Sequence, residues 1–463
     1  MPLPISSLVE DLDPDLVRRF ALSGPRYTSY PTADRFVDTF GPADHIAALA
    51  KRKAGAPLSV YVHIPFCESL CYYCGCNKIV TRDRRRGSSY VDDLNREIAL
   101  QLPPLGDDRR LSQLHFGGGT PTFLTDADIK RLMEALRQAF EFSTVGEYSI
   151  EIDPRTVTAR RIALLGSLGF NRMSIGVQDF DADVQRAVHR LQPAGLVFNA
   201  IAAAREHGFK SINLDLIYGL PRQSVQSFAT SLDTVIETGA DRIALYNYAH
   251  LPARFKPQRR IAESECPDIE ARVRIFRLAL GRLTDAGYVY IGLDHFAKPD
   301  DELAIALRTG QLQRNFQGYS TQPDCDLLAL GVSGISKIGA TYSQNVRDVQ
   351  AYQDMLAAGK LPVTRGITLN DDDLVRRAII MAFMCQGMVS IKAIEASHGI
   401  DFQTTFAPEL AALAPYEEMG LVNRDSEAIW TTPRGRLLVR AVCMVFDKYM
   451  RSAPLRASYS KVA

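Results

Sequence analysis

Short apolar runs alternate with amphipathic stretches along the first half of the chain. The runs at 58–64, 113–116, 148–152, 172–177, 212–217 and 243–246 have the length and composition of buried strands. The gaps between them carry apolar residues at helical spacing, as in SYVDDLNREIALQL and DIKRLMEALRQAF. Repeated strand and helix units connect with right-handed crossovers and close into a barrel or part of one. The pattern therefore predicts an α/β fold built on a partial (βα)6 barrel.

The pattern changes beyond about residue 370. Three helical stretches, DDDLVRRAIIMAFMCQG, IKAIEASHG and LAALAPYEEMG, precede LVNRDSEAIWTTPRGR, which resembles a two-stranded wing, and a last helix runs through Val442 and Met444. We therefore expect a mainly α, winged-helix-like domain over 371–463, after a catalytic domain over 41–370. Its second helix has no basic face, which favours a lid or packing role over DNA binding. Segment 1–40 lacks periodicity and is expected to cover the barrel mouth.

Polar and glycine residues follow the ends of the six predicted strands. They are the cysteine-rich loop after the first strand, residues 117–121, Glu151 with Asp153, Gln178, Asp215, and residues 247–250. The carboxyl ends of parallel strands meet at one edge of such a fold, and the chemistry gathers there. Glycines 117–119 allow close backbone approach to a ligand, although a plain tight turn explains them as well. A dinucleotide fingerprint is not supported, because position 122 is Thr and Pro121 interrupts the helix entry.

Three thiols, Cys67, Cys71 and Cys74, stand in the segment HIPFCESLCYYCGCN. Three thiolates can hold a [4Fe–4S] cluster while one iron keeps an open position, which predicts an enzyme rather than an electron carrier. A structural zinc site would need a second ligand pair, and none follows. Cys76 is interpreted as a non-ligand, because two ligands separated by a single residue, as Cys74 and Cys76 are, would crowd the cluster. The scattered cysteines are expected to act as small hydrophobes: Cys266, Cys325, Cys385 and Cys443.

Composition indicates a large soluble enzyme. The chain has 463 residues and a net charge of +1, which gives no basic surplus for nucleic acid and no apolar run long enough for a membrane span. The N-terminus has no export pattern, so we expect reduced thiols and a cytoplasmic location. The charged run at 82–86 is expected to be a solvated loop, with attraction of an anionic substrate as the alternative.

The motifs resemble those of the radical S-adenosylmethionine (SAM) superfamily, with CxxxCxxC after the first strand and GGGTP after the second. The resemblance to one family of that superfamily, the oxygen-independent coproporphyrinogen III oxidases, runs from about residue 20 to the C-terminal end. Its motifs are SGPRYTSYPTA, YVHIPFCESLCYYCGCNKIVTR, HFGGGTPTFL, EIDPR, MSIGVQDF, INLDLIYGLP, YNYAHLPARF, GLDHFAKPDDELA, NFQGYSTQ and GVSGIS. The resemblance implies a [4Fe–4S] cluster ligated by Cys67, Cys71 and Cys74, and two SAM molecules.

The implied reaction is the radical oxidative decarboxylation of the ring A and B propionates of coproporphyrinogen III to vinyl groups. It gives protoporphyrinogen IX in anaerobic haem biosynthesis, with a low-potential electron donor such as flavodoxin, in a monomer. Two other functions compete with this interpretation. A haem-binding chaperone of the same superfamily usually lacks the GPRYTSYPT segment and has an aromatic residue at position 76. A non-catalytic iron–sulfur or winged-helix regulator would not need polar groups at six strand ends.

The resemblance also implies the residues of the site. The first SAM is expected to contact Tyr61, Gly118, Glu151 and Ile335. The second is expected to contact Tyr73, Gly119, Thr120, Gln178, Arg190, Asp215 and Ala249. Carboxylates at the ends of apolar strands would be costly to bury without a partner, which supports Glu151 and Asp215 from the residues themselves. Core packing for Tyr61 and a surface charge for Arg190 are the alternative interpretations.

Two further features bear on the chemistry. The family commonly has Phe where this chain has Tyr73, so the phenolic oxygen needs a partner or solvent. Cys76 matches an additional family cysteine that is needed for activity without ligating the cluster, and proton or electron transfer is its expected role. An anionic substrate also needs cations, and the candidates are Arg26, Arg254, Arg259 and Arg260, each of which has an ordinary surface role as the alternative.

Overall fold

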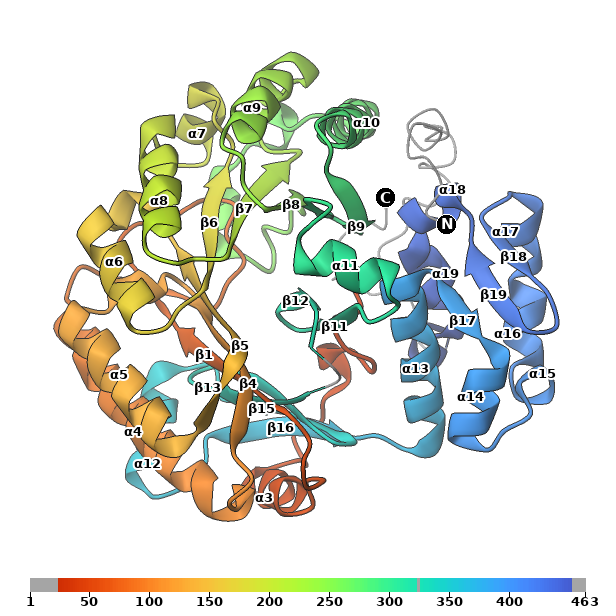
Figure 1. Cartoon of the computed structure of the whole chain (residues 1–463), viewed down its shortest axis with the longest axis horizontal. Helices are drawn as coiled ribbons and strands as arrows, with labels where there is room; N and C mark the ends of the chain where they lie inside the picture. The colour runs from red at the N-terminus through yellow and green to blue at the C-terminus, as the bar shows by residue number, and fades with distance from the viewer. Residues whose placement is uncertain (1–23, 323–324, 452–463) are drawn as a thin grey trace.

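Six parallel strands form the barrel arc in the computed structural model, which describes residues 24–322 and 325–451. Neighbouring strands of the arc pair in parallel, and each is followed by at least one helix on the outer side (Figure 1). The predicted partial barrel is therefore confirmed. The strands are β1 (Leu58–Ile64), β4 (Arg110–Gly118), β5 (Glu141–Ile152), β6 (Arg172–Gln178), β7 (Ser211–Tyr218) and β8 (Arg242–Asn247).

The outer helices begin at side chains that satisfy their first free N–H groups. Thr125 accepts a hydrogen bond from the Asp128 N–H before α5, and Ser224 forms a capping box with Ser227 before α9. The charged run at 82–86 does not form a loop throughout, because α4 already begins at Arg85. The helices are α4 (Arg85–Leu105), α5 (Asp126–Ala139), α6 (Ala159–Ser167), α7 (Ala182–Ala187), α8 (Ala194–Glu206), α9 (Val225–Glu237) and α10 (Ile269–Asp285).

Additional strands extend both edges of the arc into one twelve-stranded sheet. On the β1 side, β13 pairs in parallel with β1 and the next three strands follow it antiparallel. On the β8 side, β10 and then β9 are antiparallel. The sequence pattern did not predict these strands, which are β9 (Val289–Gly292), β10 (His295–Ala297), β13 (Asp326–Leu330), β14 (Ile335–Ile338), β15 (Thr341–Asn345) and β16 (Val363–Thr368). Two helices, α3 (Pro42–Ala50) and α12 (Val349–Ala357), lie near this extension (Figure 1).

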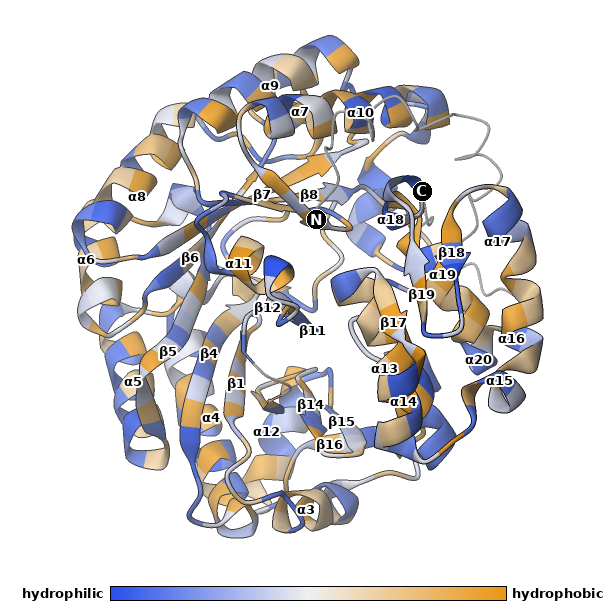
Figure 2. Ribbon diagram, turned by 45° about the vertical axis from the view of Figure 1, so that its right-hand side comes forward, coloured by the Kyte–Doolittle hydropathy of each residue, from blue (hydrophilic) through white to orange (hydrophobic). Residues whose placement is uncertain are grey.

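The main hydrophobic core lies between the sheet and its outer helices. Fully buried residues such as Val60, Phe116 and Leu214 belong to it, and Figure 2 shows hydrophobic and hydrophilic positions alternating along the barrel helices. The opposite face of the strands is polar, with a cavity of about 170 Å³ lined by residues that include His115, Ser149, Ser174 and Asn213. A barrel of this kind is usually filled by branched apolar side chains, so the polar interior marks space for ligands.

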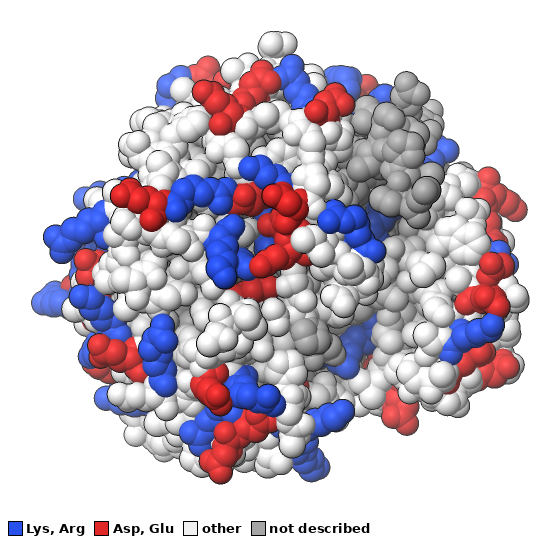
Figure 3. Space-filling view, in the orientation of Figure 1, with Lys and Arg blue, Asp and Glu red and all other residues white. Residues whose placement is uncertain are grey.

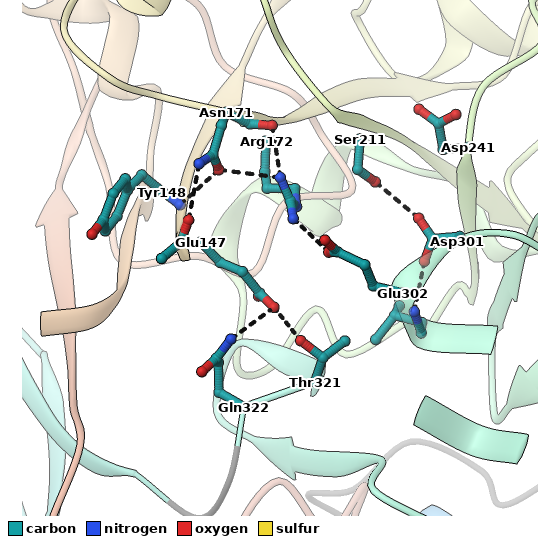
Figure 4. A network of polar contacts seen from close by, with 12 residues as sticks. Glu147, Tyr148, Asn171, Arg172, Ser211, Asp241, Asp301, Glu302, Thr321 and Gln322 are labelled. Atoms are coloured by element: carbon teal, nitrogen blue, oxygen red, sulfur yellow. Dashed lines mark hydrogen bonds and ion pairs between the residues drawn. The ribbon is translucent and has the colours of Figure 1, made fainter. Parts of the chain in front are cut away.

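A polar network closes the amino-terminal edge of the barrel (Figure 4). Arg172, the first residue of β6, pairs with Glu302 at the start of α11 (Glu302–Arg308). Ser211, the first residue of β7, donates to Asp301 at 3.1 Å, and Arg242 pairs with Asp301 at 2.9 Å. These contacts fix α11 across the strand starts, next to the cavity of about 170 Å³ that Arg172, Ser211 and Arg242 also line.

The C-terminal region is mainly helical and has its own hydrophobic core, which includes Phe383, Phe402, Ile429 and Phe446. A small antiparallel sheet, in the order β17-β19-β18, contains the predicted two-stranded wing and one strand that was not predicted. The third predicted helix is divided into short helices around Pro415. The elements are α13 (Asp371–Gln386), β17 (Met388–Ser390), α14 (Ile391–His398), α15 (Phe402–Thr405), α16 (Ala407–Ala412), α17 (Ala414–Glu418), β18 (Val422–Arg424), β19 (Ala428–Thr431), α18 (Pro433–Leu437), α19 (Val439–Phe446) and α20 (Lys448–Arg451).

The described part of the N-terminal segment joins the two regions. Tyr27 and Tyr30 belong to the C-terminal core, while Val37 bridges to Gly366 of β16. Residues 1–23 of the expected cover lie outside the described residues.

Lys and Arg side chains are interspersed with Asp and Glu on the face in Figure 3. Within 24–322 and 325–451, no helix has the length and hydropathy for crossing a membrane.

Candidate active site

The cysteine loop leaves the carboxyl end of β1 and is closed by two very short strands. β2 (Phe66–Cys67) pairs in parallel with β3 (Ile79–Val80), and Thr81 N donates to Cys67 O at 2.9 Å. Within the loop, Cys74 N donates to Cys71 O at 3.3 Å, which makes a turn between the second and third thiols. His63 and the Asn77 carbonyl lie 3.0 Å apart, which ties the far end of the loop to β1. The loop is thus anchored at both ends.

The glycine run after β4 packs directly against the start of this loop. Gly119 N donates to Ile64 O at 2.8 Å, and Thr120 N donates to Phe66 O at 2.9 Å. Gly118 has a φ of 112°, which side-chain-bearing residues rarely adopt. A Cβ atom on Gly119 would lie 2.8 Å from Phe66 O. The run therefore permits a backbone contact that positions the cysteine loop, and it is more than a plain tight turn.

A cavity of about 690 Å³ lies at the carboxyl ends of the strands. It brings together most of the site residues predicted from the sequence: Cys67, Cys71, Tyr73, Cys74, Cys76, Gly118, Gly119, Thr120, Glu151, Gln178, Arg190, Asp215 and Ala249. Two predicted residues do not line it. Tyr61 stacks on His115 in the barrel interior, with ring centroids 5.8 Å apart, and Ile335 begins β14 and packs near Phe36 and Tyr342.

Hydrogen-bond donors point at the sulfurs of this cavity. Thr120 Oγ1 donates to Cys67 Sγ at 3.5 Å, and Arg190 Nη1 donates to Cys71 Sγ at 3.5 Å. Such donors favour the thiolate form that binds iron. Among the described residues, no three His, Cys, Asp or Glu side chains converge on a single metal ion. A cubane needs no such convergence, because each thiolate binds a different iron, so the thiols and their donors fit a [4Fe–4S] cluster.

Two carboxylates from neighbouring parts of the arc face the same cavity. Glu151 of β5 lies 3.1 Å from His115 Nε2 and accepts from Gly118 N at 3.3 Å. Burial alone would raise the pKa of Glu151, but these contacts hold it below its usual value. Asp215 of β7 accepts from Ser174 at 2.9 Å, yet burial and then the charge of Glu151 raise its pKa to about 7. The pair thus offers one ionised and one readily protonated acceptor.

An arginine and carboxylate network supports the Cys71 side of the cavity. Arg190 pairs with Asp153 at 3.2 Å and donates to Gly176 O at 2.6 Å. Arg155 pairs with the same carboxylate at 2.6 Å and reaches Cys71 Sγ at 3.8 Å. Burial raises the pKa of Asp153, but Arg155 and Arg190 outweigh it and lower the value. Arg190 is buried, which excludes the alternative of a surface helix charge.

The four candidate substrate cations lie in different surroundings. Arg26 pairs with Asp294 and lies over the Tyr246 ring, 5.6 Å from its centroid, at the mouth of the barrel. The other three belong to the exposed segment after β8, where Arg259 donates to Pro252 O and Arg260 to the Tyr72 hydroxyl. Only Arg26 therefore lies beside the barrel interior.

The sequence patterns missed several residues of the site. Arg155, Ser174, Tyr246 and Gln258 line the cavity. Asn247, which was predicted at the end of its strand, lines it as well, and its buried Oδ1 has no hydrogen-bond partner among the described residues. An unpaired buried acceptor of this kind indicates a place for a ligand donor. The signal for Ser174 was available, because the alternate positions of the strand sequence RMSIGVQ are Arg, Ser, Gly and Gln, none of which has an apolar side chain.

Comparison with known proteins identifies the family. The sequence model of the Radical SAM superfamily matches residues 61–235, and that of the HemN C-terminal domain matches residues 369–438. The oxygen-independent coproporphyrinogen III oxidase of Pseudomonas aeruginosa is 49% identical over 453 residues, which cover 97% of this chain and 98% of that protein. The oxidase of Escherichia coli K12 is 47% identical, with 98% of each chain covered. The chain belongs to the oxygen-independent coproporphyrinogen III oxidases.

The solved structure of a relative agrees with this assignment. Coproporphyrinogen III oxidase from Escherichia coli, described as a radical SAM enzyme, superposes with a TM-score of 0.90 at 46% identity. The match covers 95% of this chain and 99% of that one. The predicted fold and family are confirmed, and the chain is an oxidoreductase that uses a [4Fe–4S] cluster and SAM.

Proposed function

We propose that the cavity of about 690 Å³ is the reaction centre for the oxidative decarboxylation of coproporphyrinogen III, with Cys67, Cys71 and Cys74 as the cluster ligands. The reaction converts the ring A and B propionates to vinyl groups and gives protoporphyrinogen IX. The observation that carries the proposal is the convergence of three thiols, one buried and one part-buried arginine contact to sulfur, and two carboxylates in one cavity. When bound, the cluster and SAM supply the 5′-deoxyadenosyl radical that removes a propionate β-hydrogen.

The chain's own residues bind and orient the reactants. We assign Glu151 and Gly118, which line the cavity, to the first SAM. Tyr61 and Ile335 are assigned to it as well, although neither lines the cavity in this structure; Tyr61 stacks on His115, the partner of Glu151. Glu151 is held by Gly118 N at 3.3 Å, so its free lone pairs can accept from ribose hydroxyls or an ammonium group. We assign a second SAM to Tyr73, Gly119, Thr120, Gln178, Arg190, Asp215 and Ala249, all of which line the cavity.

The decarboxylation of each propionate requires that one electron be removed from the substrate radical. After loss of a β-hydrogen atom, the propionate carbon radical releases CO2 and one electron and forms the vinyl double bond. An external acceptor must take that electron. Cys76, which is exposed next to the cluster loop, is assigned a role in proton or electron transfer without ligating iron. Its position on the cavity lining supports this assignment.

Further parts of the proposal concern the setting of the enzyme. We propose a monomer that works in the cytoplasm, receives electrons from a low-potential donor such as flavodoxin, and binds neither nucleic acid nor membrane. Its proposed domains are the segment 1–40 over the barrel mouth, a catalytic domain over 41–370 and a winged-helix-like domain over 371–463. The separate hydrophobic core of the C-terminal region supports the last boundary.

Anaerobic reconstitution tests the proposal. Purified protein should take up about four irons and four sulfides, bind SAM, and form protoporphyrinogen IX with a low-potential reductant. Single Cys→Ala changes at positions 67, 71 and 74 should remove the cluster, whereas Cys76→Ala should retain it. A fully protein-capped cluster would contradict the ligand assignment. Tight haem binding without SAM cleavage would instead favour a chaperone.

A further inference from the structure

A second cavity, of about 530 Å³, lies between the barrel and the C-terminal region. The antiparallel hairpin of β11 (Gln313–Asn315) and β12 (Gly318–Ser320) forms one side, and α13 forms another. Its lining combines apolar residues such as Phe316, Leu374 and Met381 with the polar residues Arg314 and Asn315. Its volume lies within the usual range for small-molecule sites.

Arg314 is a buried cation that has no carboxylate partner among residues 24–322 and 325–451. Arg314 is only 9% exposed. Its Nε and Nη1 atoms have no hydrogen-bond partner among the described residues. The third nitrogen, Nη2, donates to the Arg26 main-chain oxygen at 3.4 Å. The Arg314 guanidinium also lies over the Tyr319 ring, 4.6 Å from its centroid. A ring face and one carbonyl do not replace a carboxylate, and an unpaired buried charge is costly.

Two other arginines lie near Arg314. Arg26 pairs with Asp294, and the contacts of Arg440 include the main-chain oxygens of Gly24 and Pro25. Burial, followed by the charges of Arg26 and Arg314, lowers the pKa of Arg440 to about 9. Burial and then Arg314 likewise lower the pKa of His295. The field in this part of the molecule therefore favours an incoming anion.

A series of rings connects Arg314 to the reaction centre. Tyr319 meets His295 edge to face, with centroids 5.3 Å apart, and His295 meets Tyr246 in the same way at 6.0 Å. Tyr246 also lines the cavity that holds the three thiols. These rings also line the cavity of about 170 Å³, together with Asp215 and Glu151. A ligand lying along this cavity would have one end near Arg314 and the other beside the two carboxylates. A tetrapyrrole with several propionates has that form, whereas a single amino-acid carboxylate does not.

We propose that Arg314 binds a propionate carboxylate of coproporphyrinogen III, one that remains intact while another propionate reacts near the cluster. The planar guanidinium has an unpaired N–H on each of two edges, at Nε and at Nη1, and a carboxylate oxygen can accept from either edge. The inference rests on the substrate of the oxidase family. It goes beyond that assignment by naming the residue and the cavity that receive the distant edge of the macrocycle.

Binding of coproporphyrin III to the reconstituted holoenzyme tests this inference. Coproporphyrin III is the oxidised, fluorescent form of the substrate, and its tetra-amide has the same framework without charges. Arg314→Gln should weaken binding of the acid by about 30-fold or more, because a buried charged pair loses one partner. Binding of the tetra-amide should change by less than about twofold. Arg314→Lys keeps the charge but loses the fork, and should give an intermediate loss.

Controls separate this role from folding and from the cofactor site. Arg308→Gln removes an exposed cation on α11 and should leave both affinities unchanged. SAM affinity, iron content and substrate-free SAM cleavage should be the same in both Arg314 variants, and the KM should rise more than kcat falls. Equal weakening of acid and amide would show a structural role and overturn the inference. Unchanged binding of coproporphyrin III, or a loss of affinity for SAM alone, would overturn the inference as well.

Discussion

The Arg190 guanidinium lies 3.5 Å from the sulfur of Cys71 and donates a hydrogen bond to it. The contact joins a residue proposed to bind SAM with a proposed cluster ligand. Arg190 is itself fixed by Asp153 at 3.2 Å, so its position does not depend on a ligand. One side chain therefore influences both the charge at the cluster and the shape of the adjoining SAM site.

Replacing Arg190 should make the cluster harder to reduce. Arg190→Gln removes a positive charge and a donor from Cys71, and both stabilise the reduced, more negative cluster. We expect the reduction potential to fall by on the order of tens of millivolts. An EPR-monitored redox titration measures this value. Arg160→Gln, which changes a side chain that is 91% exposed, is the control, and equal potentials in both variants would contradict the expectation.

Glu151→Gln should weaken SAM binding without loss of iron. The carboxylate is held by Gly118 N and His115, so its remaining lone pairs act as preoriented acceptors. Loss of a charged hydrogen bond corresponds to about 10- to 100-fold in the dissociation constant. Anaerobic calorimetry with SAM checks this expectation. A variant with the wild-type affinity would show that Glu151 serves only to hold the glycine run.

Gly119→Ala should impair cluster assembly. The added Cβ would lie 2.8 Å from Phe66 O and 3.0 Å from Ile64 O, and neither backbone atom can move without shifting the cysteine loop. We expect a large fall in iron content per chain after reconstitution, with secondary structure retained by circular dichroism. Gly41→Ala is the matched control, since a Cβ there meets nothing within 4 Å. Full iron content in Gly119→Ala would refute the positioning role of this contact.

The buried Glu97 should give stability a distinctive pH dependence. It accepts hydrogen bonds from Tyr352 at 2.6 Å and from Gly331 N and Asn345 at 2.7 Å, yet burial raises its pKa to about 7. The folded state therefore holds a proton that the unfolded state releases near pH 4.5. This contribution is complete below about pH 4.5 and is lost as the pH rises through about 7.

Comparison with Glu97→Gln isolates this effect. The variant has no titrating group, so the wild type should lose stability relative to it by up to about 1.4 kcal/mol per pH unit between these limits. Urea unfolding at pH 5.5, 6.5 and 7.5 (roughly the span set by the two pKa values) measures the difference. The variant is expected to be less stable at low pH, because it loses the carboxyl contacts. Parallel stability curves would contradict a raised pKa for Glu97.

The strands of the arc could be predicted because each is an apolar run bounded by turns. The predicted run 58–64 coincides with β1, and 172–177 falls one residue short of the end of β6. The polar interior was not predicted, although Gln113, His115 and Ser149 occupy alternate strand positions. Buried apolar runs and half-polar strands look alike when the polar residues are few.

The sheet extension had no comparable local signal. β13 pairs with β1 although the two strands are far apart in the sequence, as the paired residues Leu58 and Asp326 show. Parallel pairing over such a separation depends on tertiary contacts. Ile335 is an example. The family resemblance assigned it to the first SAM, but the sequence pattern did not predict the strand β14 that it begins. Arg314 was missed for a related reason: its significance is the absence of a partner, which only three-dimensional structure reveals.

The contact between the two ends of the described chain can form only late in biosynthesis. Arg440 donates to the carbonyls of Gly24 and Pro25, which precede it by 416 and 415 positions. At typical translation speeds, about 20 to 80 seconds separate the appearance of these residues from the ribosome. The Gly24 and Pro25 carbonyls therefore gain this partner only after α19 has been made, later than the partners of Arg26 and Val37, which are Asp294 and Gly366.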